Sequence, residues 1–302
     1  MQLGFVTAIL HDLPFDEVVA FASGEGFACI EPMCWPVGKA ERKFAGVTHI
    51  DVATLGEREV AAIQATLQRG NVFLTSLGYY PNLLSADASH AGPALAHLKQ
   101  VIAAAPRLGV GTVTTFIGAD HRAHPEDNFA AFLALWPDLI RMAESHGVRI
   151  AIENCPMLFT RDEWPSGKNL AYSPAVWRKM FEAIPSDHFG LNYDPSHLIW
   201  QFMDHIAPIV HFKDKLFHIH AKDTAIDRAK LDDVGILALG WQTPVIPGRG
   251  EVDWNRFFAA LKTAGYDGPV VIEVEDDSFG KSLEGRKKAL LESRKALERF
   301  FS

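Results

Sequence analysis

Short apolar runs alternate with amphipathic stretches along the 302 residues of the chain. The apolar runs predict eight strands: Leu3–Leu10, Ala28–Cys34, Val72–Leu77, Thr112–Ile117, Arg149–Asn154, Phe189–Asp194, Leu216–His220 and Val270–Val274. Between them, apolar residues recur every three or four positions, which is the period of a helix with one buried face. These stretches predict eight helices: Phe15–Glu25, Glu57–Arg69, Ala94–Ala105, Pro125–His146, Ser173–Ile184, His205–Lys215, Asp253–Ala264 and Ser282–Phe301.

Eight strands, each followed by a helix, are typical of a (β/α)8 TIM barrel. The alternative is a doubly wound open sheet, which usually has a glycine-rich turn after its first strand. Here that turn is Ile9–Leu13, which contains no glycine. Without a linker or low-complexity segment, we predict one domain over residues 1–302. Two long irregular segments, Pro156–Tyr172 and Thr224–Gly250, follow the fifth and seventh strands, on the face where TIM-barrel active sites lie.

The charge balance narrows the choice of partners. Lys and Arg number 29 against 37 Asp and Glu, giving a net charge of −8, which disfavours binding to nucleic acid. The three cysteines, Cys29, Cys34 and Cys155, indicate neither a disulfide framework nor a zinc finger. No basic segment precedes the first apolar run, and no run is long enough to cross a bilayer. We therefore expect a soluble, cytoplasmic protein with no membrane partner; the sequence leaves open whether it forms a homo-oligomer.

The stretch around Asp194 gives the first indication of a site. Phe189–Tyr193 predicts a buried strand that ends in this carboxylate, because Pro195 has no N–H to continue the ladder. His197 follows on the next bend. A carboxylate and a histidine placed this way can bind one small ligand or metal together. Alternatively, Asp194 caps a turn and His197 is an ordinary loop residue. The stretch by itself favours neither interpretation.

Three further predicted strands also end in ionisable groups. The fifth ends in Glu153, and the eighth carries Glu273 near its end. Alternation along the seventh places His220 and Lys222 on one face, with His218 deeper on the same face, where a supporting or core role is expected. Four neighbouring strands therefore each deliver an ionisable group at the same end of the predicted barrel.

Three carboxylates in one apolar mouth would raise each other's pKa, and a divalent cation removes that conflict. Three carboxylate oxygens and one imidazole nitrogen suit Mn²⁺, Mg²⁺, Co²⁺ or Zn²⁺ with open coordination positions. The set lacks the thiolates of a closed structural zinc site. The alternative is that these four groups are separate caps and surface charges. Because they occur on four successive strands, each at a strand end, the pattern favours one metal site.

Five motifs carry a likeness to a known family: Ile152–Asn154, Asn192–His197, His218–Thr224, Pro247–Trp254 and Ile272–Asp276. Along its whole length, the chain resembles the xylose isomerase-like TIM barrels, the sugar phosphate isomerase/epimerase group. The resemblance implies one divalent ion, with Mn²⁺ expected first, bound by Glu153, Asp194, His220 and Glu273. It also implies that Glu153 and Glu273 exchange protons with a carbon of the substrate.

The expected reaction is isomerisation or epimerisation of a sugar or sugar derivative by proton transfer next to a carbonyl. Phe159 and Ile226 replace the glutamate and arginine of the ketohexose 3-epimerase pattern, so the resemblance does not identify the sugar. Arg228, Lys168 and Arg249 are alternative sources of the lost contacts.

Other functions were weighed against this one. A lyase or dehydratase acting on a keto-sugar, a keto-inositol or a 3-keto-glycoside would share the metal, the base and the first step. An endonuclease IV-like hydrolase ranks lower, because the second and third strand ends carry no histidine. A sugar-binding protein without catalysis does not require paired glutamates.

Four residues are expected to contact the carbohydrate substrate: His197, Lys222, Trp35 and Tyr80. The histidine would hold a hydroxyl or carbonyl group, or else make a local loop hydrogen bond. The lysine would neutralise oxyanion charge, or else form a salt bridge to Glu275 or Asp194. The two aromatic residues would stack on a sugar ring, with burial in the core as the alternative.

Overall fold

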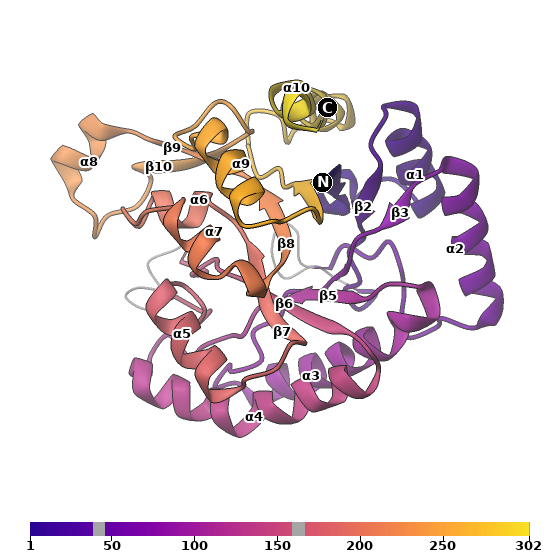
Figure 1. The fold of residues 1–302 in the computed structure, drawn as a ribbon, viewed down its shortest axis with the longest axis horizontal. Helices are drawn as coiled ribbons and strands as arrows, with labels where there is room; N and C mark the ends of the chain where they lie inside the picture. The colour runs from indigo at the N-terminus through magenta and orange to yellow at the C-terminus, as the bar shows by residue number, and fades with distance from the viewer. Residues whose placement is uncertain (39–45, 159–166, 302) are drawn as a thin grey trace.

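Parallel strands close into a barrel in the computed structural model, which describes residues 1–38, 46–158 and 167–301 (Figure 1). The sheet contains β1 (Gln2–Val6), β2 (Cys29–Glu31), β3 (Phe73–Leu74), β4 (Leu77–Gly78), β5 (Thr112–Thr115), β6 (Arg149–Glu153), β7 (Phe189–Tyr193), β8 (Leu216–Ala221) and β11 (Pro269–Ile272). The order is β3-β2-β1-β11-β8-β7-β6-β5-β4. Because only Thr75 and Ser76 separate β3 from β4, these two are halves of one barrel strand, and the predicted eight-stranded TIM barrel is confirmed.

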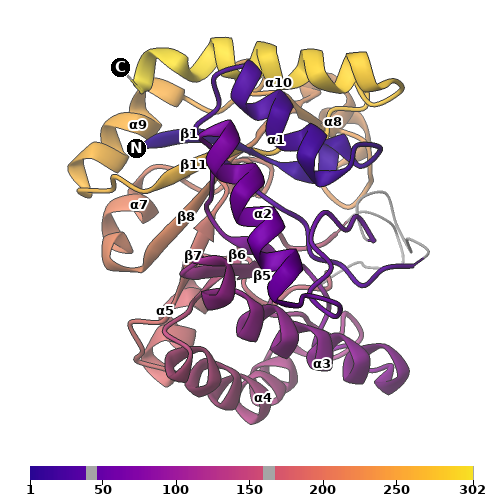
Figure 2. The ribbon, with the colours of Figure 1, turned by 90° about the vertical axis from the view of Figure 1, so that its right-hand side faces the viewer.

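Helices surround the barrel, as the two ribbon views show (Figures 1 and 2). The main ones are α1 (Phe15–Gly24), α2 (Glu57–Gly70), α3 (Ala88–Ala104), α4 (Pro125–Ser145), α5 (Pro174–Ala183), α7 (Ala207–His211), α9 (Trp254–Thr263) and α10 (Leu283–Leu297). Three of them begin at capping side chains, including Asp87 at the start of α3. Asp253 accepts a hydrogen bond from the Arg256 N–H at 3.0 Å, and Ser282 accepts one from Gly285 at 3.0 Å. Such caps satisfy N–H groups that have no partner within the helix.

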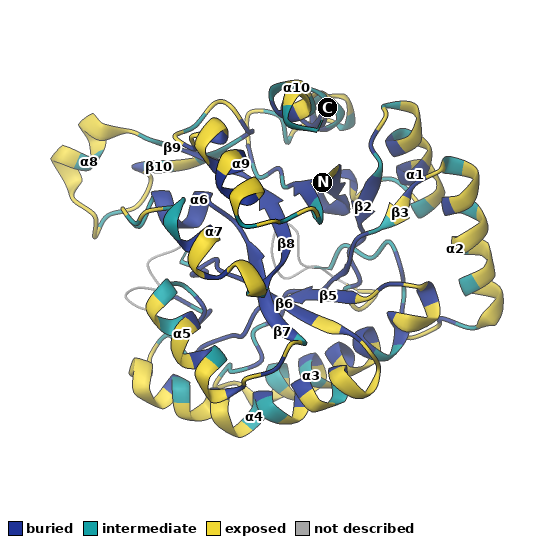
Figure 3. Cartoon of the chain, viewed as in Figure 1, coloured by how far each residue is buried: buried dark blue, intermediate teal, exposed yellow. Residues whose placement is uncertain are grey.

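The core lies between the sheet and the inner faces of the helices, which alternate with exposed outer faces (Figure 3). Phe132 and Trp136 of α4 stack against Phe189 of β7, with ring centroids 6.1 and 6.2 Å apart, and none of the three is exposed. This packing fixes the outer layer against the strands that deliver the site residues.

Three predicted element boundaries were wrong. The first strand ends at Val6, and Thr7–Leu10 forms a 3-10 helix. Helix α3 begins at Ala88, ahead of the predicted start, because the Asp87 side chain accepts a hydrogen bond from Ser89 N–H at 2.9 Å. The predicted helix His205–Lys215 is helical only in α7 and in a short 3-10 turn at its end.

The segment after β8 is more ordered than the sequence predicted. Strands β9 (Asp223–Ile226) and β10 (Gln242–Val245) pair antiparallel, and α8 (Arg228–Val234) lies between them in an arm that projects from the barrel (Figure 1). The short helix α6 (Ser196–Ile199) follows β7. Among the described residues, none of the helices has the length and apolarity that a membrane crossing requires.

Candidate active site

The four predicted metal ligands come together at the C-terminal end of the barrel. Glu153 is the last residue of β6, Asp194 follows β7, Glu273 follows β11, and His220 lies within β8. One possible ligand atom from each lies within 4.8 Å of the others. Parallel strands place their C-terminal ends on one face of the barrel, and this brings together residues far apart in sequence.

Local hydrogen bonds hold Asp194 in place but leave one of its carboxylate oxygens without a hydrogen-bond partner. Its backbone is held from both sides by Asn154, whose side chain accepts from Asp194 N–H at 2.8 Å and donates to Asp194 C=O at 2.9 Å. Its Oδ1 accepts a hydrogen bond from Ser196 N–H at 2.8 Å. Its Oδ2 is buried, makes no hydrogen bond, and faces Lys222 Nζ and His197 Nε2, each at 3.2 Å. A cation could replace this ionic contact with Lys222 as the partner of the oxygen.

His220 presents one ring nitrogen in the same way. Its Nε2 contacts Glu31 Oε2 at 2.8 Å, while its buried Nδ1 has no hydrogen-bond partner and lies 3.4 Å from Glu273 Oε2. Three carboxylates and this imidazole therefore fit a divalent cation, with Asp194 Oδ2 and His220 Nδ1 as two buried atoms that make no hydrogen bond.

Glu31 is a site residue that the sequence reasoning missed. It is the last residue of β2 and is not exposed at all. Thr114 Oγ1 donates to its Oε1 at 2.6 Å, and Tyr80 Oη donates to the same oxygen. Burial raises the pKa of its carboxyl, but His220 outweighs that effect and lowers the pKa to about 2. The available signal was a carboxylate after two apolar residues at a strand end, the same pattern as Glu153.

His218 contacts residues that hold His220 in place, which is the supporting role expected from its deeper position on the strand. Its Nδ1 lies 3.0 Å from Asn192 Oδ1, and its Nε2 lies 2.9 Å from Thr75 Oγ1. Asn192 Nδ2 in turn lies 3.0 Å from His220 Nε2. Burial lowers the pKa of His218 to about 4, so the ring is neutral at pH 7.

Lys222 places an ammonium group among the carboxylates. Its Nζ lies 2.7 Å from Glu273 Oε2 and 3.2 Å from both Asp194 Oδ2 and Glu275 Oε2. The salt bridges weighed as the alternative role of this lysine are thus present. The side chain also lines the cavity described below, so it is in place to contact a substrate as well.

His197 lies between the metal-ligand candidates and a neighbouring aromatic residue. Its Nδ1 accepts a hydrogen bond from Trp200 Nε1 at 3.3 Å, which places the ring proton on Nε2. That Nε2 lies 3.2 Å from Asp194 Oδ2 and 3.3 Å from Glu153 Oε1. Burial lowers the pKa of His197 to about 4, and the ring is neutral.

The carboxyls at the centre differ in their affinity for protons. Burial, with the nearby charge of Glu273, raises the pKa of Glu153 to about 8. Burial also raises the pKa of Asp194, against the opposing effect of Lys222. The pKa of Glu273 is lowered instead, because Lys222 and His220 outweigh the effect of burial. The metal-free site therefore pairs a protonated glutamic acid with an ionised glutamate.

A cavity of about 370 Å³, here called the catalytic cavity, opens above these groups. Trp35 and Tyr80 line it together with Glu153, Lys222 and Glu273, whereas Asp194, His197 and His220 do not. The two aromatic residues thus lie where a ring in this cavity would contact them. His197 is buried and lies against Glu153 and Asp194, so it is placed to act on these carboxylates.

The residues named as alternative sources of the lost epimerase contacts, Arg228, Lys168 and Arg249, are not among the described residues that line this cavity. Phe159 lies outside the described residues, and Ile226 pairs with Gln242 in the projecting arm. Arg228 forms an ion pair with Glu251 at 2.6 Å. Arg249 and Lys168 are likewise absent from the described lining of the catalytic cavity, which leaves Lys222 as its lysine.

A family model described as the xylose isomerase-like TIM barrel matches residues 19–300. The chain belongs to this family. The uncharacterized protein YfiH of Bacillus subtilis (strain 168) is 25% identical over 91% of this chain and 93% of its own. The inosose dehydratase of Geobacillus thermodenitrificans (strain NG80-2) is 31% identical over 37% of this chain and 38% of its own.

Solved structures of the family share the barrel. The zinc-bound IolI protein aligns with a TM-score of 0.75 and 18% identity over the full length of both chains. D-psicose 3-epimerase, solved in the presence of D-fructose, aligns with a TM-score of 0.68 and 17% identity over 98% of this chain and 99% of its own. At these identities the likeness establishes the fold and leaves the reaction to be argued from the site.

Proposed function

We propose that this protein is a metal-dependent isomerase or epimerase that removes a proton next to a carbonyl of a sugar or sugar derivative. The observation that carries the proposal is the placement of Glu153 and Glu273 in one small cavity. They lie at the ends of β6 and β11, which β7 and β8 separate, and together with Asp194 and His220 they form a possible cation site. Two carboxyl groups at different sides of a substrate carbon are what removal and return of a proton require.

Glu153, Asp194, His220 and Glu273 would bind the divalent ion, Mn²⁺ being the expected one and Mg²⁺, Co²⁺ or Zn²⁺ fitting the same donor atoms. When bound, the ion supplies Lewis-acid stabilisation of negative charge on the substrate oxygen.

The protein's own groups account for the remaining steps. One of the two glutamates accepts the proton from carbon, and the other returns a proton to the neighbouring position or to the opposite face. The Lys222 ammonium, 2.7 Å from Glu273, lowers the energy of negative charge that develops beside it. His197 Nε2 lies 3.3 Å from Glu153 Oε1, so the ring packs against that carboxyl and limits its orientation.

The size of the catalytic cavity restricts the substrate. About 370 Å³ is at the lower end of the range for ligand cavities and suits one sugar ring or an open-chain sugar. Trp35 and Tyr80 supply aromatic surface for the apolar face of such a ring. The paired glutamates and Lys222 supply hydrogen-bonding groups for its hydroxyls.

A second candidate is a lyase that eliminates water after the same proton removal. The observation in its favour is the sequence match to inosose dehydratases, which reaches 31% identity over about a third of the chain. A keto-inositol would then be the first substrate to test, followed by keto-sugars and 3-keto-glycosides. A hydrolase resembling endonuclease IV finds no support, since the described ends of β2 and β4 present Glu31 and Tyr80 instead of histidines.

Proton exchange followed by NMR tests the shared step and separates the two outcomes. Metal-loaded protein is incubated in D₂O with ketoses, keto-inositols and 3-keto-glycosides. Deuterium entering next to the carbonyl with the carbon skeleton and hydroxyls retained identifies an isomerase or epimerase. Loss of one hydroxyl identifies the lyase. Absence of both exchange and elimination across the set would reject the proposal.

Two variants then assign the base. Glu153→Gln and Glu273→Gln each keep the shape of the side chain, and each should lower turnover by about 100-fold or more if the carboxyl transfers a proton. Metal content is measured in the same samples, because each glutamate is also a proposed ligand. Glu126→Gln, in the exposed first turn of α4 and outside the cavity, is the matched control. Wild-type deuterium exchange in both metal-replete variants would make His197 or Lys222 the leading candidate for the base.

A further inference from the structure

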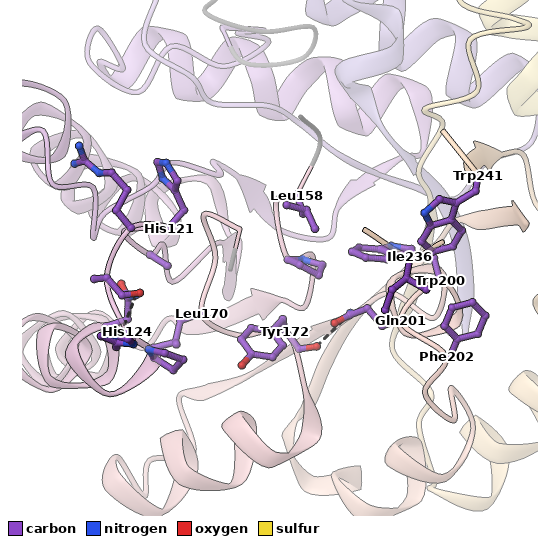
Figure 4. Close-up of a pocket in the computed structure, with 16 residues that line it drawn as sticks. His121, His124, Leu158, Leu170, Tyr172, Trp200, Gln201, Phe202, Ile236 and Trp241 are labelled. Atoms are coloured by element: carbon purple, nitrogen blue, oxygen red, sulfur yellow. Dashed lines mark hydrogen bonds between the residues drawn. The ribbon is translucent and has the colours of Figure 1, made fainter. Parts of the chain in front are cut away.

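A second, larger cavity of about 770 Å³ lies on the same face of the barrel (Figure 4). We call it the aromatic cavity, after Tyr172, Trp200, Phe202 and Trp241, which line it. These residues come from the loop after β6, from the end of α6 and from the projecting arm. The catalytic cavity has about half this volume and shares none of its described lining residues.

The aromatic side chains gather at one end of this cavity. Figure 4 shows Trp200, Phe202 and Trp241 together, with His121 and His124 at the opposite end. The rings of Phe202 and Trp241 stack at 5.9 Å with 16° between their planes. Phe202 has a φ of 57°, an uncommon backbone state for a non-glycine residue, so the loop conformation that presents its ring is a restricted one.

The lining indicates the chemical class of ligand. Flat aromatic faces pack well against another planar ring, and cavities of this volume with mostly apolar walls commonly hold small molecules. The described lining contains no Asp or Glu, whereas Arg122 is present near its imidazole end. The aromatic faces could contact a cation, but no carboxylate among these residues would offset its charge, and Arg122 itself pairs with Asp120 at 3.3 Å. The favoured ligand is therefore a planar aromatic molecule that is uncharged or anionic.

One short segment separates the two cavities. Cys155 and Met157 line the catalytic cavity, while Pro156 and Leu158 line the aromatic cavity. The Asn169 side chain fixes this wall by donating to Cys155 C=O at 2.6 Å and to Glu153 C=O at 2.9 Å. The wall makes the aromatic cavity a site for a separate molecule, adjacent to the catalytic cavity.

A two-residue path also links the aromatic cavity to the proposed metal ligands. The Trp200 indole lines the cavity, and its N–H donates to His197 Nδ1 at 3.3 Å. The other nitrogen of that ring lies 3.2 Å from Asp194 Oδ2 and 3.3 Å from Glu153 Oε1. A ligand that shifts the indole would therefore change the hydrogen bond that orients His197 against both carboxylates.

We propose that the aromatic cavity binds a planar aromatic molecule, uncharged or anionic, and that its occupancy changes the metal affinity of the catalytic site through Trp200 and His197. The coupling rests on the proposed metal site, whereas binding in the cavity does not. The two parts are therefore measured separately.

Binding is measured with naphthalene-2-carboxylate, followed by tryptophan fluorescence and by calorimetry on the full chain. Its saturated analogue, decahydronaphthalene-2-carboxylate, should bind about fivefold to tenfold more weakly, because it lacks a planar face. Trp241→Leu should weaken naphthalene-2-carboxylate about tenfold. Phe73→Leu, which alters an exposed aromatic residue outside the cavity, should leave its affinity unchanged. No saturable binding, equal binding of both compounds, or wild-type affinity in Trp241→Leu would overturn the site.

Coupling is measured as the Mn²⁺ dissociation constant with and without saturating naphthalene-2-carboxylate. In the wild type the constant should change about fivefold or more, and Mn²⁺ should change the affinity for the aromatic compound by the same factor. Trp200→Phe keeps an aromatic ring but removes the N–H, so it should retain binding within about twofold and lose the coupling. Equal Mn²⁺ affinity in both conditions for the wild type, or full coupling in Trp200→Phe, would overturn the path. Absence of Mn²⁺ binding altogether would count against the proposed function while leaving the cavity result intact.

Discussion

Replacing Glu31 with glutamine should weaken metal binding although Glu31 is not a proposed ligand. Its carboxylate contacts His220 Nε2 at 2.8 Å and is completely buried. With its pKa at about 2, the group is ionised at pH 7. It therefore holds a ring proton on Nε2, so that Nδ1 is the nitrogen that faces the other carboxylates. Glutamine has nearly the same shape but carries no charge.

The expected size of the effect follows from how supporting carboxylates act on metal-binding histidines. Such a partner fixes the ring orientation and makes the ligand nitrogen more basic, and its loss typically lowers metal affinity about 10- to 100-fold. That corresponds to about 1.4 to 2.8 kcal/mol of binding free energy. The neutral amide retains the ring orientation in part, because its oxygen still accepts a hydrogen bond, so we expect the lower half of this range.

The assay is calorimetric or indicator-competition titration of the chelated, metal-free protein with Mn²⁺. Thr114→Val is the matched control, because it removes a 2.6 Å hydrogen bond to the same carboxylate but leaves the charge in place. The control should change the Mn²⁺ affinity by less than about threefold, because the carboxylate keeps its charge and its contact with His220. Circular dichroism confirms that both variants are folded. Mn²⁺ affinity within twofold of wild type in folded Glu31→Gln would refute the role assigned to this carboxylate.

Three further outcomes are expected. Asp194→Asn should weaken Mn²⁺ binding, because a neutral oxygen replaces an anionic one; activity retained in fully chelated wild-type protein would exclude a catalytic metal. Mn²⁺ affinity should rise by up to about tenfold per pH unit as the pH increases toward 8. The reason is that the pKa of Glu153 is about 8 in the metal-free protein, so its carboxyl must lose a proton when the metal binds. An Mn²⁺ affinity that does not change with pH would contradict this. Trp136→Ala should lower the free energy of unfolding by about 3 to 5 kcal/mol in urea, since the indole is fully buried; a loss below about 1 kcal/mol would contradict the packing described for α4.

The barrel and the four proposed ligands could be predicted from the sequence because both depend on local patterns. A buried parallel strand is an apolar run, and its C-terminal end is marked by the first ionisable residue after it. Glu153, Asp194 and Glu273 each have this mark, His220 was singled out by its alternation with His218 and Lys222 along β8, and barrel topology is enough to place such residues together. Their role as ligands stays a prediction until metal binding is measured.

Element boundaries and the projecting arm were not predictable in the same way. The 3-10 helix Thr7–Leu10 is apolar throughout, so its pattern does not differ from that of a strand. The pairing of β9 with β10 joins residues some twenty positions apart, and the intervening segment carries no short turn signal that would predict it.

The tertiary structure alone decided which polar groups face one another. In the sequence, Glu31 stood out only as one residue of a strand end that lacks histidine. In the structure its carboxylate orients His220, although β1 and β11 lie between their two strands. Likewise the hydrogen bond from Trp200 makes His197 a residue that orients carboxylates beneath the catalytic cavity. Sequence determines which side chains emerge at the end of each strand, because that depends on local alternation. Closure of the barrel determines the partners of each side chain, because strands distant in the chain become neighbours only when the sheet closes.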